Sequence, residues 1–117
     1  MRVVVTDEAK ADLVEIGEFI RPHNPAREAT FVDELLDRCA TLADIPRAFP
    51  LIPRYEHHGI RRCVYRDYLI FYRVLENLVE IIHILHGARN YEVLLFPDET
   101  MADYKEMLHC VSPLRLA

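Results

Sequence analysis

Apolar residues in the first half of the chain repeat with the period of an amphipathic helix. Ala9, Leu13, Ile16 and Ile20 recur at i, i+4, i+7 and i+11, which places them along one side of a helix. A second stripe with helical spacing follows after Pro25 and consists of Val32, Leu35, Leu36, Cys39, Leu42 and Ala43. The short segment RPHNP separates the two, so the pattern predicts two antiparallel helices joined as a hairpin.

Residues at the helix ends support these two helices. Thr6 or Asp7 can cap the first helix, and Asn24 followed by Pro25 is a typical start for the second. The four residues before the first cap, Arg2 to Val5, are predicted to form a short strand. Gly17 interrupts the first helix at a cost of about 1 kcal/mol relative to alanine, and we interpret it as a position of close packing.

The second half of the chain has the pattern of a three-strand meander. Residues 46–59 are rich in proline and predict a loop. Three β-rich runs follow, at 60–65, 68–75 and 78–85, separated by two residues each, as in tight hairpins. The resulting register places Val64 opposite Leu69 and Arg73 opposite Glu80, and the second pair has opposite charges.

Strand alternation divides these three runs between the two faces of a sheet. We expect the face under the helices to carry Val64, Leu69, Phe71, Ile82 and Ile84. The opposite face is rich in tyrosine and is expected to be a partner surface. Its predicted members are Arg61, Cys63, Tyr65, Tyr68, Ile70, Tyr72, Ile81 and His83.

The end of the chain predicts a further short helix. The segment HGARNY turns out of the last strand, and Asn90 can cap a helix that reaches Phe96. The fold class is therefore α+β: an N-terminal strand, a helical hairpin, a meander and a short C-terminal helix. We assign one domain to residues 1–96 and an extension, helical in part, to residues 97–117.

Composition excludes several classes of protein. The chain has 117 residues and a net charge of −5, which argues against a dedicated nucleic-acid-binding protein. The charge is uneven, at −5 over residues 1–46, +3 over 47–89 and −3 over 90–117, and twelve of the fourteen basic residues are arginine. No apolar run is long enough to span a membrane, and no signal segment begins the chain, so we expect a cytoplasmic protein.

Neither a cofactor nor a metal is expected from the motifs. The three cysteines form no CxxC pair, and three glycines in the whole chain leave no phosphate-binding loop. His83 and His86 are three apart, so on a strand they point to opposite faces. The adjacent pair His57 and His58 in the loop is an equally weak indication of a metal site.

Three segments resemble the RelE/ParE superfamily of type II toxin–antitoxin toxins. They are TDEAKADLVEIGEFI, GIRRCVYRDYLIFYRVLENLVEIIHILHGARNY and the following EVLL, and the chain looks most like the ParE branch with the plasmid-stabilisation proteins over about residues 1–96. The resemblance implies a toxin that inhibits DNA gyrase and is neutralised by a ParD-like antitoxin. It also implies a hetero-oligomeric complex that contacts operator DNA only through the antitoxin.

The same superfamily contains ribosome-dependent mRNA endonucleases of the RelE type. That reaction needs a general base, a general acid and cations near the phosphorane, and the candidates are Arg61, His83, Arg89 and Tyr91. With only two lysines and a net charge of −5, the chain fits a protein target better than an RNA-rich ribosome. A third hypothesis is a decayed toxin that only binds its antitoxin.

Two sets of interface residues follow from this interpretation. Arg89 and Tyr91, just past the last strand, are predicted to contact the target, with ordinary ion pairing and packing as the alternative. The antitoxin is predicted to contact the sheet and also the groove of the helical hairpin. The sheet residues of this second set are Arg61, Tyr65, Arg66, Tyr68 and Tyr72.

Overall fold

The computed structural model describes residues 1–97 of the 117. It contains two compact units, Met1–Gly87 and the part that begins at Ala88, and each is described by itself. Within residues 1–97, no helix has the length and apolarity needed to cross a membrane. The extension predicted from residue 97 onward falls, after Pro97, outside the described residues.

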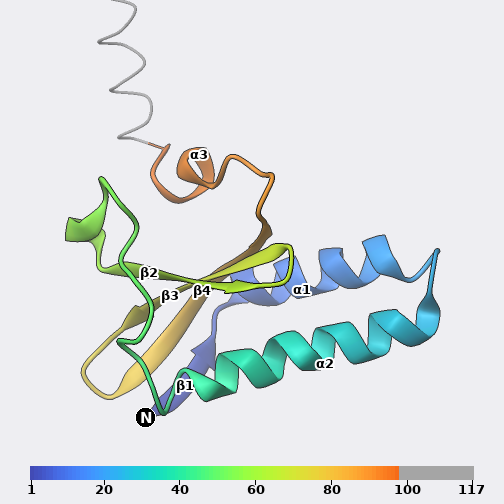
Figure 1. Cartoon of the computed structure of the whole chain (residues 1–117), viewed down its shortest axis with the longest axis horizontal. Helices are drawn as coiled ribbons and strands as arrows, with labels where there is room; N and C mark the ends of the chain where they lie inside the picture. Colours follow the sequence, from blue (N-terminus) through green and yellow to red (C-terminus); the bar gives the residue numbers. More distant parts are fainter. Residues whose placement is uncertain (98–117) are drawn as a thin grey trace, which may run out of the picture. The chain divides into compact units, whose positions relative to one another are not determined.

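The first unit has the predicted α+β architecture, with every predicted element in the predicted order (Figure 1). The helical hairpin continues past the end of the sheet, so the far halves of both helices project from it (Figure 1). The elements are β1 (Arg2–Val5), α1 (Asp7–Ile20), α2 (Pro25–Thr41), a 3-10 turn (Glu56–His58), β2 (Ile60–Tyr65), β3 (Tyr68–Val74) and β4 (Leu78–His86).

The helix ends lie where the polar residues predicted them. Thr6 caps α1 by accepting a hydrogen bond from the Ala9 amide at 3.2 Å, and Asn24 caps α2 through the Arg27 amide at 3.0 Å. The interpretation of Gly17 is confirmed as well. A Cβ atom there would lie 3.0 Å from Oε1 of Glu28, so the Glu28 side chain of α2 packs directly against α1 at this position.

The four strands form one sheet in the order β1-β4-β3-β2, with β1 parallel to β4 and the other pairs antiparallel. Val64 lies opposite Leu69, and Arg73 lies opposite Glu80 with an ion pair at 3.6 Å, so both predicted pairs are confirmed. In the β2–β3 turn, Arg66 takes a left-handed φ of 54°, which lets two residues close the hairpin without glycine.

A β-bulge in β4 changes the predicted division of faces. Phe71 pairs with His83, but the next residue, Tyr72, pairs with Ile81, so Ile82 has no partner of its own. Residues on the two sides of the bulge therefore exchange faces. The consequence is that Ile81 and Ile84 lie in one core cluster, although simple alternation assigns them to opposite faces.

The tyrosine-rich face lies under the helices, so the predicted assignment of the two faces was wrong. Cys63, Ile70 and Tyr72 are fully buried in one cluster with the apolar stripes of α1 and α2, and Tyr65 and Tyr68 pack against its border. In contrast, Val64 on the other face is 58% exposed. Alternation separates the two faces of a strand but does not determine which face the helices cover.

The loop before β2 covers the outer edge of that strand. The Ile52 amide donates to the Ile60 carbonyl at 3.1 Å, and the Arg62 amide donates to the Pro50 carbonyl at 3.1 Å. The first part of the β2 edge is therefore paired, which shortens the edge open to unwanted strand addition. Ile52 and Tyr55 of this loop are themselves buried.

The second unit contains the predicted short helix, α3 (Tyr91–Leu95). Asn90 is its N-cap residue by position, but within residues 88–97 its side chain makes no capping hydrogen bond. The Phe96 amide closes the helix by donating to the Glu92 carbonyl at 2.8 Å. The predicted span, Asn90 to Phe96, is thus longer by one residue at each end.

Candidate functional site

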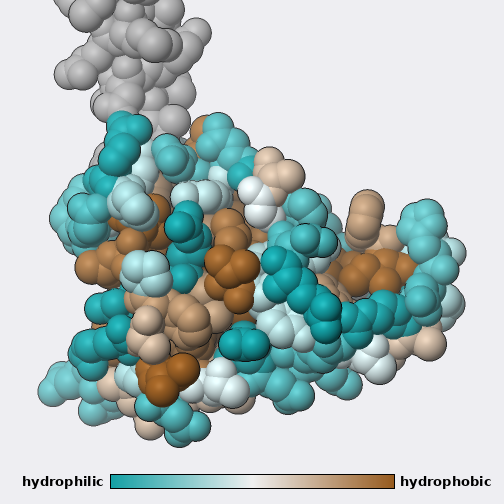
Figure 2. Space-filling view, in the orientation of Figure 1, coloured by the Kyte–Doolittle hydropathy of each residue, from teal (hydrophilic) through white to brown (hydrophobic). Residues whose placement is uncertain are grey.

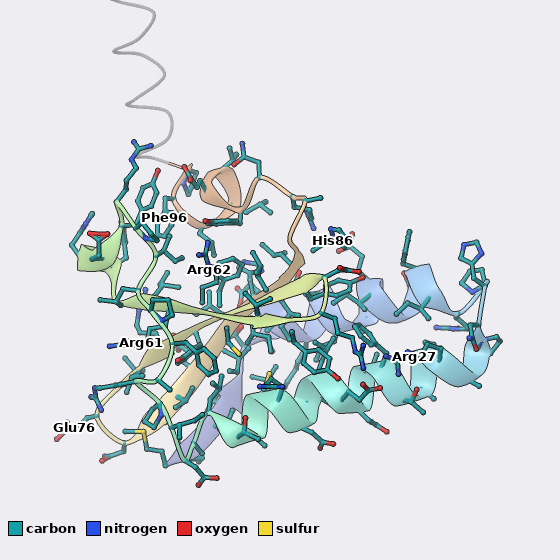
Figure 3. The ribbon with its side chains drawn as sticks, in the orientation of Figure 1. Arg27, Arg61, Arg62, Glu76, His86 and Phe96 are labelled. Atoms are coloured by element: carbon teal, nitrogen blue, oxygen red, sulfur yellow. The ribbon has the colours of Figure 1, made fainter. Side chains whose placement is uncertain are left out.

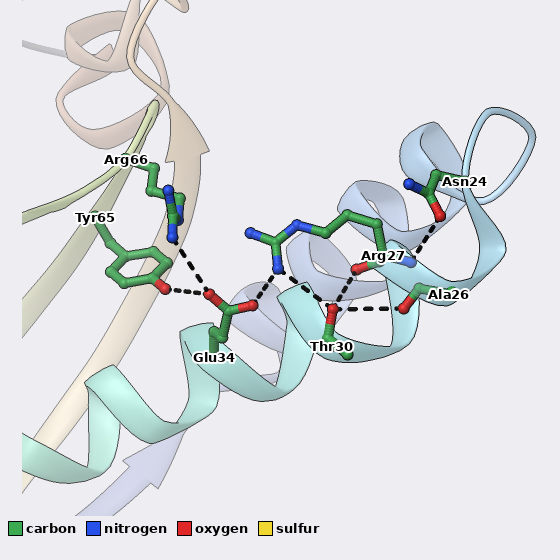
Figure 4. Close-up of polar contacts among 7 residues, drawn as sticks. All are labelled: Asn24, Ala26, Arg27, Thr30, Glu34, Tyr65 and Arg66. Carbon is green, nitrogen blue, oxygen red and sulfur yellow. Dashed lines mark hydrogen bonds and ion pairs between the residues drawn. The ribbon is translucent and has the colours of Figure 1, made fainter.

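Arg27 and Glu34 of α2 meet Tyr65 and Arg66 where this helix passes the β2–β3 turn (Figure 4). From the turn come Tyr65, Arg66 and Tyr68, and from α2 come the residues spaced at i, i+4, i+7 and i+11 from Arg27, which lie along one side of a helix. We call this group the arginine–tyrosine cluster. Its members are Arg27, Phe31, Glu34, Arg38, Tyr65, Arg66 and Tyr68.

Glu34 lies at the centre of the polar part of the cluster (Figure 4). Its Oε1 accepts a hydrogen bond from the Tyr65 hydroxyl at 2.5 Å, and its Oε2 forms an ion pair with Arg27. Nη2 of Arg66 lies 3.9 Å from Oε1. The hydrogen bonds from Tyr65 and then Arg27 hold the pKa of the Glu34 carboxyl below its ordinary value of 4.5, because both stabilise the charged form.

The aromatic part of the cluster supports two stacked arginines on a single ring. The guanidinium carbons of Arg38 and Arg66 lie 5.2 Å and 5.6 Å from the centroid of the Tyr65 ring, within cation–π range. The Phe31 ring lies 6.0 Å from Tyr65 and 5.4 Å from Tyr68. These contacts place the ring and both guanidinium groups before any partner arrives.

The cluster is accessible to solvent on its charged side. The side chains of Arg66, Arg27 and Glu34 are 61%, 37% and 31% exposed, whereas Phe31 is buried. Burial, and secondarily the charge of Asp67, raises the pKa of the Tyr68 hydroxyl. The hot spots of protein interfaces, where most of the binding energy is concentrated, are enriched in tyrosine and arginine. The buried Phe31 ring and the exposed arginines of the cluster match this pattern.

Exposed apolar side chains also occur on the helical hairpin, on more than one side of α1. Val14 and Phe19 of α1 are 60% and 70% exposed, and Figure 2 shows apolar surface over the far half of the hairpin. Leu36 of α2 is also 39% exposed. Apolar side chains presented on adjoining helices can receive the apolar face of a partner segment.

Three of the five residues predicted to bind the antitoxin lie together in the cluster, namely Tyr65, Arg66 and Tyr68. Tyr72 does not belong to an accessible surface, because it is fully buried and its hydroxyl donates to the Pro46 carbonyl at 2.9 Å. Arg61 lies elsewhere, with Nη1 donating to the Phe49 carbonyl at 2.7 Å.

The structure separates Arg61 from His83, two residues predicted to share a face. Arg61 is aligned with Tyr72 and Ile81, whereas His83 is aligned with Phe71, and paired residues of neighbouring strands share a face. The bulge at Ile82 causes this difference. Figure 3 shows that Arg61 and its neighbour Arg62 point away from each other on β2.

His83 is engaged by a carboxylate from α1. Its Nδ1 lies 2.7 Å from Oδ2 of Asp12, and the same oxygen accepts a hydrogen bond from the Ile84 amide at 3.0 Å. The Asp12 side chain is only 11% exposed. Arg89 and Tyr91 belong to the second unit, where the Tyr91 amide donates to the Arg89 carbonyl at 2.9 Å, and their predicted target contact stays a prediction.

Sequence reasoning missed the α2 half of the cluster. Arg27, Phe31, Glu34 and Arg38 follow a helical stripe as regular as the apolar one, so the signal was present in the spacing. The sequence could not show which residue of β2 lies beside this stripe. That match depends on which face of the sheet the helices cover.

No metal centre is formed by the described residues. Residues 1–97 contain no group of three or more histidine, cysteine or acidic side chains that could hold an ion. Cys39 and Cys63 are both buried and unbridged. Burial raises the pKa of the Cys39 thiol to about 12, so this thiol stays protonated at neutral pH.

Comparisons with known proteins agree with this architecture. The sequence profile of the family described as ParE toxin of type II toxin-antitoxin system, parDE, matches residues 3–91. Among solved structures, the fold is similar to a chain of the chromosomal ParDE TA system from P. aeruginosa, with a TM-score of 0.65 and 19% identity over 74% of this chain and 95% of that chain. A comparison with curated proteins gave no match.

Proposed function

Because the chain belongs to the ParE toxin family of type II toxin–antitoxin systems, we propose that it inhibits DNA gyrase and that a ParD-like antitoxin neutralises it. The match over residues 3–91 carries the proposal. Inhibition by binding needs exposed anchor residues rather than a catalytic centre. A gyrase target also implies that the protein acts in the cytoplasm.

The alternative, an mRNA endonuclease, finds less support in the geometry. Nη1 of Arg61 is bound to the Phe49 carbonyl, and His83 is bound to Asp12. The two lie on opposite faces of the sheet, so they do not converge on one phosphate. Acid–base catalysis requires groups within hydrogen-bonding reach of one reacting centre.

The antitoxin is proposed to use two surfaces, the arginine–tyrosine cluster and the exposed apolar residues of α1. Val14 and Phe19 would receive apolar side chains, and Arg66 would receive acidic ones. A segment that is disordered when free can wrap both surfaces, gaining area from one and specificity from the other. Operator DNA would then be contacted by the antitoxin alone, within a hetero-oligomeric complex.

Induction of the toxin without its antitoxin tests the proposal. We expect growth arrest, induction of the DNA-damage response and filamentous cells, and purified protein should trap cleaved DNA on gyrase. Codon-specific mRNA cuts within minutes, with gyrase unaffected, would instead establish the endonuclease. Unimpaired growth together with tight antitoxin binding would identify a decayed toxin.

Arg89→Ala is the variant that tests the predicted target contact. The residue belongs to the second unit, outside the core of the first. If it contacts gyrase, the variant should lose toxicity and keep antitoxin binding. Arg47→Ala, which removes an exposed arginine from the loop before β2, is the matched control and should remain toxic.

A further inference from the structure

We infer that Arg38 and Arg66 form a receptor for the carboxylates of an acidic partner segment, and that Glu34 holds this receptor in shape by engaging Arg27 and Tyr65. The inference rests on the proposed function, because the segment we expect there belongs to the antitoxin. It adds the chemistry of that segment, which should carry neighbouring aspartate or glutamate side chains.

The charges of the cluster are unequal. Glu34 is in direct contact with Arg27, but Arg66 lies 3.9 Å from it. Among residues 1–97, Arg38 has no ion pair and is placed by its stacking on Tyr65. Even when the nearby Asp67 is counted, three guanidinium groups face two carboxylates, in a chain whose net charge is −5.

Arg38 and Arg66 differ in how far the guanidinium group is engaged. Arg38 lies over the Tyr65 ring, whereas the Arg66 guanidinium is also hydrogen-bonded to the Tyr65 side chain and lies near Glu34. With five N–H donors in each group, both keep donors for a carboxylate. A guanidinium group that lies over a ring uses its flat face, and its N–H donors remain in the plane for a carboxylate. The Tyr65 ring that positions both groups is itself fixed by its hydroxyl bond to Glu34 at 2.5 Å. Little side-chain entropy would therefore be lost when a carboxylate binds.

The arrangement favours an acidic peptide over a nucleic acid. Glu34 and Asp67 are fixed negative charges beside the receptor, and they would repel a continuous row of phosphates. A peptide can place one or two carboxylates at Arg38 and Arg66 and cover the neighbouring rings with apolar side chains. Tyr65 and Tyr68 provide such rings.

The test uses the full chain and two synthetic peptides, hexaglutamate and hexaglutamine. In ¹⁵N-edited spectra, hexaglutamate should shift the Nε–Hε signals of Arg38 and Arg66 but not that of Arg47, and hexaglutamine should shift none. Because an exposed charge pair contributes up to about 1 kcal/mol, Arg38→Gln and Arg66→Gln should each weaken hexaglutamate binding by up to about fivefold.

Glu34→Gln gives the opposite sign, which separates this inference from a general loss of structure. Removing the central carboxylate should tighten hexaglutamate binding, by up to about fivefold, whereas Arg47→Gln should leave it unchanged. Circular dichroism would verify that each variant is folded. Arg38→Lys, which keeps the charge but loses the planar fork, should bind more weakly than the parent chain.

Three results would overturn the inference. They are equal shifts at Arg47, a Glu34→Gln chain that does not bind more tightly, and displacement of hexaglutamate by an equal concentration of hexauridylate. The gyrase assay is independent of all three, because it uses neither peptide. A chain that traps gyrase but ignores hexaglutamate would refute the receptor alone, and the reverse result would refute only the proposed target.

Discussion

One carboxylate from each helix of the hairpin contacts the sheet, Asp12 from α1 and Glu34 from α2. The two carboxylates have different environments. Asp12 of α1 is almost fully buried, and its Oδ2 contacts both the His83 ring and the Ile84 backbone amide. Glu34 of α2 is 31% exposed and contacts only side chains, those of Arg27, Tyr65 and Arg66.

The two environments differ because Asp12 takes the place of a missing strand at the edge of the sheet. Strand β1 accompanies β4 only as far as the pair Val5–Ile81, and beyond it the β4 edge has no neighbouring strand. Thr6 continues the pairing, because its amide and its hydroxyl donate to the Ile81 carbonyl at 3.1 Å and 2.7 Å. Asp12 accepts from the Ile84 amide at 3.0 Å. Asp12 thus completes the sheet, whereas Glu34 satisfies no backbone group and instead holds side chains of the arginine–tyrosine cluster in place.

Substitution of Asp12 should have the largest effect. Asp12→Ala leaves a buried amide and the His83 ring without their acceptor, so we expect a loss of about 2–4 kcal/mol in the free energy of unfolding. Urea denaturation followed by circular dichroism measures it. Asp12→Asn keeps a side-chain oxygen for the amide and should lose less. An alanine variant as stable as the parent would show that β4 does not need this acceptor.

His83→Ala should be the next largest. It removes one partner of Asp12 but leaves the hydrogen bond to the Ile84 amide, so we expect a loss of about 1–2 kcal/mol. The endonuclease hypothesis requires a different outcome, in which toxicity disappears without a change in stability. Comparing the urea midpoint with growth arrest at low temperature distinguishes the two, because a folded His83→Ala chain should still arrest growth.

The order of elements could be predicted because it depends on local signals. Helical spacing, the caps at Thr6 and Asn24, and two-residue gaps between strands are all written in short stretches of sequence. The bulge at Ile82 could not be predicted in this way. It arises where the pairing of β4 with β1 ends, and that place depends on strand order rather than on the sequence of β4.

The candidate site was predictable on only one side. Strand alternation placed Tyr65 and Tyr68 on the tyrosine-rich face, Arg66 stands in the turn between them, and these three do lie together. Tyr72 was included because it alternates in phase with them, but it is fully buried. On the face that the helices cover, residues at the ends of strands are more exposed than residues at their centres. The alternation of side chains along a strand indicates the face of a residue but not its distance from the strand end.

A matched pair of tyrosines tests how far the core extends along this face. Tyr72→Phe leaves the half-buried Pro46 carbonyl without the donor that the fully buried Tyr72 supplies, so we expect a loss of about 1–1.5 kcal/mol. Tyr65→Phe removes a hydroxyl at the accessible border of the core and should lose less than Tyr72→Phe, since water can replace the hydroxyl as a donor to Glu34. Equal losses in urea denaturation would contradict the division between a structural and a binding region.

The smallest effect concerns the acid titration of Glu34. Its folded pKa lies below 4.5 because Tyr65 and Arg27 stabilise the carboxylate. A carboxyl group with a lowered pKa stabilises the folded state fully above its unfolded value, and this stabilisation disappears as the pH falls through the folded value. The stability difference between the parent chain and Glu34→Gln should therefore be constant at neutral pH and shrink below pH 4.5. Carboxyl ¹³C spectra give the titration midpoint directly, and Glu15→Gln controls for the loss of one exposed charge on a helix. A Glu34 midpoint at or above 4.5 would mean that Tyr65 and Arg27 do not stabilise the charged carboxylate. Glu34 would then not fix the positions of the side chains around Arg38 and Arg66, and the receptor would not be preorganised for a partner.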